Sequence, residues 1–272
     1  MQDPILVPGH NNLRPNGTVG SLRSSGGTQL LYPERRLVID GVEKLRGGSP
    51  TMLPLVGPQP NNPVWQRCAL AQHGLIRTLE GYKAHDTEDE VYKSGRGRAF
   101  WWEASDLFPW SFLATVESMH QEGQLRTDNT RHCLEWHHRI RCKFMGDDLA
   151  GMPCMVGGHP YFATHGYGGQ VVLPDDTCIP ITLELKDNPQ RCLLFEPNTP
   201  EDERWSNPVL IKLSYGTIEL YLAEGYTGVV VWTDHPDYIC VEPVRGFLEA
   251  TPVFLQPEMF ISCEFVAVFP LG

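Results

Sequence analysis

Alternation of hydrophobic and polar positions dominates the second half of the chain. It runs through residues 210–215 and 217–222, through 260–269 near the C-terminus, and through 181–185 (Ile-Thr-Leu-Glu-Leu). Alternation places one face of a strand on a core and the other in water. Residues 228–232, Gly-Val-Val-Val-Trp, are hydrophobic throughout, which is typical of a strand buried on both faces. The pattern therefore predicts a series of β-strands.

Helical patterning is weak by comparison. The best segment, residues 106–119, is interrupted by Pro109 and lacks helical spacing, so we expect strands or loop there. Residues 198–207 are expected to form a loop. The 26 glycines and 23 prolines suit many turns between short strands. The sequence predicts an all-β fold: one domain over residues 1–272, with many antiparallel strands in stacked sheets.

Charge and cysteine content narrow the function classes. The formal net charge is −11, and the basic clusters at 35–36 and 139–143 are short, so no nucleic-acid partner is expected. No segment approaches the roughly 18 consecutive apolar residues of a membrane span, so no membrane partner is expected. No signal peptide is visible at the start of the chain. The eight cysteines form no Cys-x-x-Cys pair and are expected as free thiols in a reducing, cytoplasmic setting.

Two glycine-containing segments carry candidate ligand-binding side chains. Residues 46–50 read Arg-Gly-Gly-Ser-Pro, and paired glycines either let the backbone approach a ligand closely or form a plain turn. Residues 73–77 read His-Gly-Leu-Ile-Arg, which can present His73 and Arg77 to one pocket. A histidine is more often an ordinary hydrogen-bonding residue than a catalyst, so this segment carries little weight alone.

Two further segments place a titratable group beside hydrophobic residues. Residues 157–162 read Gly-Gly-His-Pro-Tyr-Phe, where aromatic rings can pack on a sugar and His159 can donate to an oxygen. A core aromatic cluster with a hydrogen-bonded histidine is the alternative. Glu242 lies in an apolar strand just before Pro243, which indicates a strand end at the rim of a site. An exposed glutamate on an edge strand is the alternative.

Residues 132–138 contain many metal-ligand types but do not predict a metal site. On a strand, the even-numbered residues share one face and the odd-numbered residues share the other. The two sets are His132, Leu134, Trp136 and His138, and Cys133, Glu135 and His137. Neither face has a usual zinc spacing, and no second ligand pair follows, so no metal is expected.

Taken in order, these segments resemble the aldose 1-epimerase (galactose mutarotase-like) superfamily. Its hexose-6-phosphate 1-epimerase-like branch carries Arg-Gly-Gly-x-Pro, His-Gly-Phe-x-Arg, His-Pro-Tyr-Phe and Glu-Pro elements. Similar elements stand here at 46–50, 73–77, 159–162 and 242–243. The likeness runs from about Val19 to the C-terminus. It implies an antiparallel β-supersandwich with a sugar cleft across one sheet.

The resemblance also implies interconversion of the α- and β-anomers of a sugar, without a cofactor. Glu242 would be the general base that takes the proton of the anomeric hydroxyl. His159 would be the general acid that protonates the ring oxygen, and His73 would hydrogen-bond the sugar. A carboxylate beside an imidazolium stabilises both charged forms, so we expect a lowered pKa for Glu242 and a raised pKa for His159.

Substrate-binding residues are implied in the same way. Arg46 and Arg77 match positions that bind anionic sugars in the phosphate-using branch, and Asp202 lies where the family often has a sugar-binding aspartate. The chain departs from the family pattern at Leu75 and at Gly158, where phenylalanine is usual. These departures concern the pocket wall, and they leave the identity of the sugar open.

Three functions remain in competition. The leading one is an enzyme that epimerises an aldose or an aldose phosphate at C1. The second is a non-catalytic carbohydrate-binding or regulatory protein on the same fold, which the altered pocket positions motivate. The third is a lyase or hydrolase on a related β-sandwich. A nucleophilic serine hydrolase is disfavoured because the chain contains no Gly-x-Ser-x-Gly.

Overall fold

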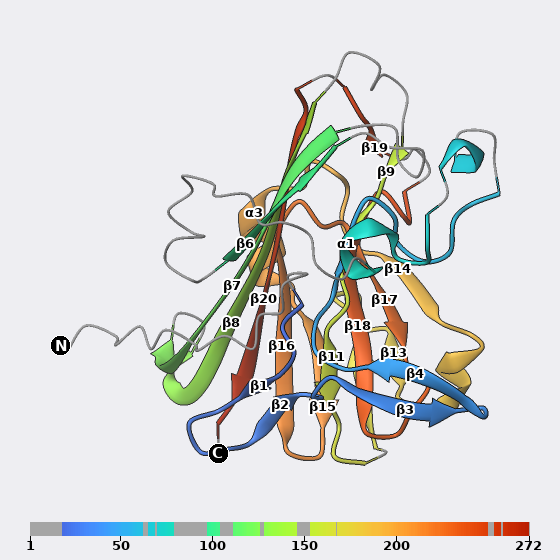
Figure 1. Ribbon diagram of the computed structural model, residues 1–272. Helices are drawn as coiled ribbons and strands as arrows, with labels where there is room; N and C mark the ends of the chain where they lie inside the picture. Colours follow the sequence, from blue (N-terminus) through green and yellow to red (C-terminus); the bar gives the residue numbers. More distant parts are fainter. Residues whose placement is uncertain are drawn as a thin grey trace.

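Two large antiparallel sheets form the body of the protein in this computed structural model (Figure 1). The structure describes residues 18–61, 65–68, 70–78, 97–103, 111–125, 128–145, 153–166, 168–249, 253–256 and 258–271. Within these residues every pair of neighbouring strands is antiparallel. The all-β, antiparallel prediction is therefore confirmed.

The first sheet is organised around strand β18. Strands β10 and β11 pair with one edge of β18 and β17 pairs with the other, while β5, β2, β1 and β14 lie further out. The strands of this sheet are β1 (Leu22–Arg23), β2 (Gln29–Leu31), β5 (Thr51–Met52), β10 (Val156–Gly158), β11 (Tyr161–Ala163), β14 (Gln190–Leu193), β17 (Gly228–Trp232) and β18 (Tyr238–Arg245).

The second sheet contains the longest strands. Its order is β13, β12, β15, β16, β20, β8, β7 and β6. The bounds of these strands are β6 (Gly97–Trp102), β7 (Ser111–Leu125), β8 (Asp128–Met145), β12 (Gly169–Val172), β13 (Cys178–Pro180), β15 (Val209–Leu213), β16 (Gly216–Glu224) and β20 (Phe260–Pro270).

Small elements decorate the two sheets. Two-stranded ribbons form from β3 (Arg35–Ile39) with β4 (Val42–Arg46), and from β9 (Pro153–Cys154) with β19 (Val253–Phe254). The helical turns of the described residues are η1 (Trp65–Arg67), α1 (Gly74–Thr78), η3 (Leu183–Lys186) and α3 (Glu201–Ser206). None of the helices in the described part of the chain is long and apolar enough to cross a membrane.

The hydrophobic core lies between the two sheets. One continuous cluster of buried side chains draws on both, and the rings of Phe162 on β11 and Phe269 on β20 lie 6.0 Å apart across it. A Cβ on Gly158 would lie 2.7 Å from the Cε1 atom of Phe265 on β20. The space that a larger side chain would need at position 158 is thus occupied from the opposite sheet, which accounts for glycine beside His159.

Several strand predictions are confirmed, and two predictions are wrong. The predicted strands at 210–215, 217–222, 228–232 and 260–269 correspond to β15, β16, β17 and β20. Residues 181–185 do not form a strand, because their last part is the turn η3. Ile181 and Leu185 are buried while Leu183 between them is 48% exposed. A spacing of four residues suits a helical turn, so the short alternation was ambiguous.

The second wrong prediction is the loop at 198–207, which contains helix α3. Three acidic residues, Glu201, Asp202 and Glu203, occupy the first turn of α3. Negative charge stabilises the N-terminal end of a helix, and this signal outweighed the turn formers around it. In the region 106–119, residues from 111 onward belong to β7, in agreement with the strand alternative, and 104–110 lie outside the described residues.

Strand β8 separates the ligand types of residues 132–138 as predicted. Leu134 and Trp136 belong to the main core cluster, while Cys133 belongs to a smaller cluster on the other face. His137 lies on that other face between the carboxylates of Glu135 and Glu264.

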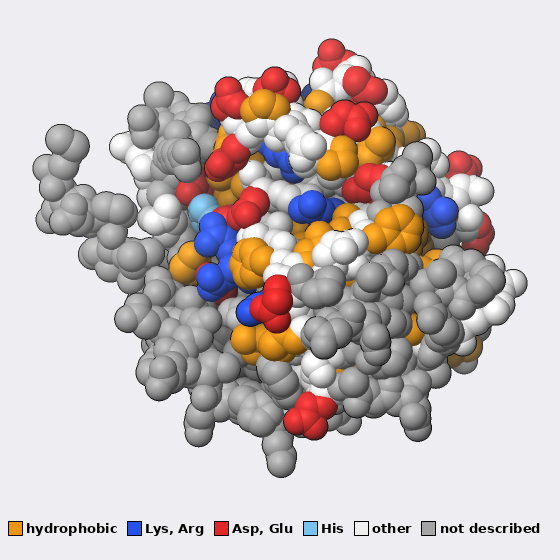
Figure 2. Space-filling model, turned by 90° about the horizontal axis from the view of Figure 1, so that it is seen from above, with side chains coloured by type: hydrophobic (Ala, Val, Ile, Leu, Met, Phe, Trp, Pro, Cys, Tyr) orange, Lys and Arg blue, Asp and Glu red, His pale blue; other side chains and the backbone are white. Residues whose placement is uncertain are grey.

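All eight cysteines are free thiols, also as predicted. In the view from above, acidic and basic side chains lie among hydrophobic ones on the described surface (Figure 2).

The contact of Gly158 with Phe265 gives a test of the packing. We expect Gly158→Ala to lower the free energy of unfolding by about 1–3 kcal/mol, because the added methyl group overpacks the core. Urea denaturation measures the change. Gly26→Ala is the matched control, since its Cβ would meet only Ser24 Oγ at an ordinary 3.7 Å. Equal stability of the two variants would contradict this account.

Candidate functional site

The pairing of β18 with β10 and β11 brings the predicted acid and base together. In β10, Gly157 lies opposite Val244, and β11 continues in the same register after a break of two residues. The break consists of His159 and Pro160, and proline cannot donate a ladder hydrogen bond. Continuing the register across the break places His159 directly opposite Glu242. Cross-strand neighbours on one face of an antiparallel pair lie close enough for their side chains to meet.

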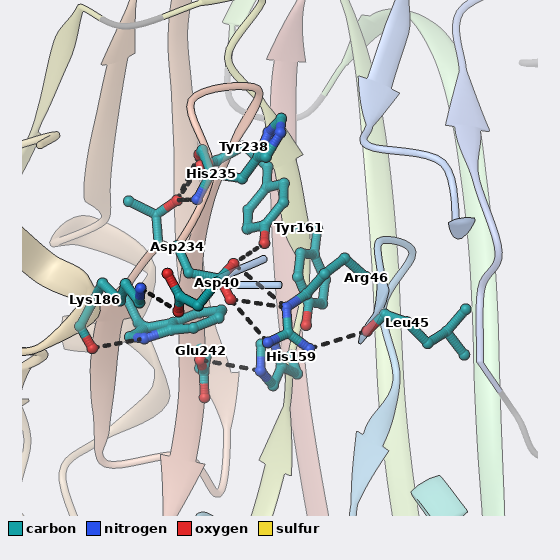
Figure 3. A network of polar contacts seen from close by, with 12 residues as sticks. Asp40, Leu45, Arg46, His159, Tyr161, Lys186, Asp234, His235, Tyr238 and Glu242 are labelled. Carbon is teal, nitrogen blue, oxygen red and sulfur yellow. Dashed lines mark hydrogen bonds and ion pairs between the residues drawn. The ribbon is translucent and has the colours of Figure 1, made fainter. Parts of the chain in front are cut away.

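The side chains of His159 and Glu242 do meet (Figure 3). His159 Nε2 lies 3.3 Å from Glu242 Oε1, and both side chains are buried. The imidazole stacks on the ring of Tyr161 at 4.7 Å and meets the edge of Trp232 at 6.0 Å. Aromatic rings therefore hold the imidazole in one orientation beside the carboxyl group.

This pair lies in the wall of a cavity of about 370 Å³. Five of the six predicted site residues line it: Arg46, His73, Arg77, His159 and Glu242. The other lining residues are Val56, Gly57, Pro58, Gln72, Tyr161, Pro189, Arg191, Val230, Trp232 and Phe247. The mixture of apolar walls with a few polar groups is typical of a small-molecule site.

Asp202 is the predicted site residue that does not line this cavity. It is exposed on α3, and α3 packs against β16 of the second sheet. The cavity is lined by the first sheet, the end of ribbon β3–β4, helix α1 and neighbouring loops. The position of Asp202 outside the cavity gives no support to a role in sugar binding, and that role stays a prediction.

A tight turn fixes the orientation of His73. Its backbone has φ +68°, and a Cβ on the next residue, Gly74, would lie 2.4 Å from the carbonyl oxygen of Leu53. The His73 amide donates to the Gly57 carbonyl at 2.9 Å, and the Gly57 amide donates to His73 Nδ1 at 3.2 Å. Because Nδ1 accepts, the neutral ring carries its proton on Nε2 and can donate it to a ligand.

Burial favours the neutral forms of His73, His159 and Glu242. Burial, followed by the positive charge of Arg77, lowers the pKa of His73 to about 3. The same two causes hold the pKa of His159 well below its usual value. Burial raises the pKa of Glu242 to about 8, although Arg77 opposes the rise. The expected directions for Glu242 and His159 were therefore wrong, because removal from water outweighs their mutual attraction.

A buried ion pair secures Arg46 in the cavity wall (Figure 3). Its Nη2 donates to Asp234 Oδ2 at 2.8 Å and its Nε donates to the same oxygen at 3.1 Å. The hydroxyl of Tyr238 donates to Asp234 Oδ1. The guanidinium carbon of Arg46 lies 5.4 Å from the centre of the Trp232 ring. Asp234 thus neutralises Arg46 and holds it against an aromatic wall.

The other two cavity arginines are held differently. Arg77 lies in the last turn of helix α1, and its Nη2 donates to the hydroxyl of Tyr161 at 3.4 Å. Arg191 is exposed on β14 at the cavity, with its guanidinium carbon 5.3 Å from the centre of the Phe247 ring. All three arginines therefore reach the cavity from different segments of the chain.

Sequence reasoning missed Asp234, Trp232 and Arg191 as site residues. Trp232 ends a strand that was predicted to be buried, and Asp234 follows in the next turn. A polar residue just after a buried strand is a signal that could have drawn attention to Asp234. No local pattern marks Arg191, because only the pairing of β14 with β17 brings it to the cavity.

The thiol of Cys240 lies beside the acid–base pair. Donor atoms of His159, Cys240 and Glu242 all lie within 4.8 Å of one another. Among the described residues, this is the group whose donor types and spacing could hold a metal ion.

Comparison with known proteins identifies the fold. No protein-family model matches this sequence, and no curated protein matches it. Solved structures do match it. A protein from Synechocystis sp. is 22% identical with a TM-score of 0.58, and the match covers 98% of this chain and 91% of that protein. A galactose mutarotase related enzyme from Lactobacillus acidophilus is 15% identical with a TM-score of 0.61, over 94% of this chain and 92% of that one.

A galactose mutarotase-like protein from Lactobacillus casei is similar as well. It is 14% identical with a TM-score of 0.58, and the match covers 93% of this chain and 94% of that protein. The chain therefore has the galactose mutarotase-like β-sandwich fold that its sequence motifs predicted. A fold alone does not define an activity, so the function has to be argued from the site.

The ion pair of Arg46 with Asp234 gives a prediction about stability. We expect Asp234→Asn to lower the free energy of unfolding by about 3 kcal/mol, because it leaves a mostly buried guanidinium without its counter-charge. Asp237→Asn is the matched control from the same turn, since its pair with Arg35 is exposed and is worth less than about 1 kcal/mol. Urea denaturation of both variants makes the comparison, and similar losses would refute the assignment.

Proposed function

We propose that this protein is an aldose 1-epimerase, which interconverts the α- and β-anomers of a sugar by general acid–base catalysis. The observation that carries the proposal is the 3.3 Å contact of His159 Nε2 with Glu242 Oε1 in the wall of the cavity. Anomer exchange needs one proton donor and one proton acceptor at neighbouring oxygens of the sugar. A carboxyl group and an imidazole in contact provide both.

The pair carries one transferable proton. Burial places it on Glu242 in the resting state, and transfer across the 3.3 Å contact to His159 Nε2 creates a carboxylate and an imidazolium. The carboxylate then takes the proton of the anomeric hydroxyl, the C1–O5 bond breaks as the C1 carbonyl forms, and Nε2–H protonates O5. Rotation about C1–C2 and closure on the other face return both protons. Each positioned transfer contributes about 10²–10⁴ in rate.

Neighbouring groups suit a sugar ring. The Trp232 ring offers an apolar wall for C–H faces, and His73 Nε2–H and the Arg77 guanidinium offer donors to sugar oxygens. Two proton transfers assist the opening and closure of the sugar ring, and the proposed mechanism assigns both to side chains of the chain itself.

Removal of the proposed base tests the function. We expect Glu242→Gln to lower kcat for anomer exchange by about 10²–10⁴, because the amide cannot accept the hydroxyl proton. Polarimetry or NMR exchange spectroscopy with a panel of free and phosphorylated aldoses measures the rate. Glu224→Gln, an exposed carboxylate outside the cavity, is the control and should keep the wild-type rate. If wild type and Glu242→Gln are equally inert towards the whole panel, the proposal fails.

The proposal also concerns whether the substrate is a free aldose or an aldose phosphate. Three arginines, Arg46, Arg77 and Arg191, line the cavity, which supports an aldose phosphate as substrate. We expect an aldose phosphate to raise the melting temperature more than the free aldose does, because tighter binding to the folded state stabilises it more. Arg77→Gln should remove most of the difference. Equal shifts in the wild type would indicate a neutral substrate.

A second candidate function is sugar binding without turnover. The raised pKa of Glu242 favours it, because a protonated carboxyl group binds a sugar oxygen but cannot act as a base. Calorimetry would then show binding of an aldose while NMR shows no acceleration of anomer exchange. Turnover that collapses in His159→Ala would rule this function out.

A further inference from the structure

The acid–base pair has a third chemical neighbour that the proposed reaction does not use. Cys240 and Glu242 are two residues apart on β18, so their side chains project from the same face of the sheet. His159 lies between β10 and β11, opposite Glu242 of β18. An imidazole, a thiol and a carboxyl group therefore converge at one point.

The spacing of these donors is close to that of a tetrahedral metal site. Zinc binds sulfur at about 2.3 Å and nitrogen or oxygen at about 2.0–2.2 Å, which separates neighbouring ligand atoms by about 3.3–3.6 Å. The distance from His159 Nε2 to Glu242 Oε1 is already 3.3 Å, and all three donors lie within 4.8 Å of one another. The donor atoms would therefore have to draw together by at most about 1.5 Å to reach this geometry.

The cavity supplies an entry path and a fourth position. His159 and Glu242 line the cavity of about 370 Å³, while Cys240 is fully buried behind them. A cation that enters from the cavity would be held by three protein ligands and would keep one position open for water. Three protein ligands with one open position define a catalytic-type zinc site rather than a closed structural one.

We propose that His159, Cys240 and Glu242 bind a thiophilic divalent cation, of which Zn²⁺ is the biological representative, in competition with acid–base chemistry at the same side chains. Thiolate ligands select zinc-like cations over Mg²⁺ and Ca²⁺. Binding releases the thiol proton and the carboxyl proton, so the thiolate and carboxylate balance the two charges of the cation. The positive charges of Arg77 and Arg46 oppose the cation, and the ion pair with Asp234 offsets that of Arg46. Competition with catalysis rests on the proposed function, but the binding itself does not.

Titration of the metal-free full-length protein with Cd²⁺ tests the site without any sugar. We expect one equivalent to bind with an ultraviolet thiolate-to-cadmium charge-transfer band, and Zn²⁺ to displace it. Cys240→Ser should abolish the band and weaken Cd²⁺ binding at least tenfold. Cys178→Ser, which removes an exposed thiol far from the cluster in the sequence, is the matched control and should keep the band.

Two further measurements protect the test against a folding defect. Glu242→Gln keeps the thiol and should weaken Cd²⁺ binding at least tenfold, and thermal unfolding checks that each variant is folded. A band that persists in Cys240→Ser, a band lost in Cys178→Ser, or no one-equivalent band in the wild type would each overturn the proposal. Where the wild type turns over a sugar, Zn²⁺ should inhibit it, and Cys240→Ser should need at least ten times more Zn²⁺. If the protein is inert towards sugars, only this inhibition measurement is lost, and the Cd²⁺ titrations still test the site.

Discussion

The contact between His159 and Glu242 is the interaction on which the site depends. A carboxyl group and an imidazole removed from water are costly unless each finds a partner or becomes neutral. Here they do both, since they lie 3.3 Å apart and burial favours the neutral form of each. The position of each backbone is set by the pairing of β18 with the strands beside it. The sheet therefore keeps the pair together without relying on opposite charges.

A second buried interaction shapes the rest of the cavity. Arg46 and Asp234 are 188 residues apart in the chain, and their ion pair ties the end of ribbon β3–β4 to the turn after β17. The carboxylate of Asp234 also compensates the positive charge of Arg46. Arg77 and Arg191 also line the cavity, although the protein as a whole carries a net charge of −11. Local pairing of charges decides what a ligand would meet, because distant surface charges are screened by solvent and salt.

Burial gives the same three side chains more than one chemical use. A neutral pair that shares one proton can donate and accept at neighbouring oxygens of a sugar. The thiol of Cys240 on the same face adds a soft ligand to the same point in space. The proposed acid–base chemistry and the proposed cation binding therefore draw on the same groups, and they exclude each other because both use the lone pairs of His159 and Glu242.

The sequence by itself determined the all-β character, the strands β15, β16, β17 and β20 of the second half, and five of the cavity residues. Alternation indicates which face of a strand is buried. The motifs around His73, His159 and Glu242 predicted the galactose mutarotase-like fold. The sequence could not distinguish a strand from a helical turn at Ile181–Leu185. Two buried hydrophobic residues four positions apart are compatible with both structures. The tertiary structure alone decided the pKa directions, the capture of Arg46 by Asp234 and the approach of Cys240 to the pair. Each of these follows from desolvation or from contacts between distant segments, which no local pattern of residues encodes.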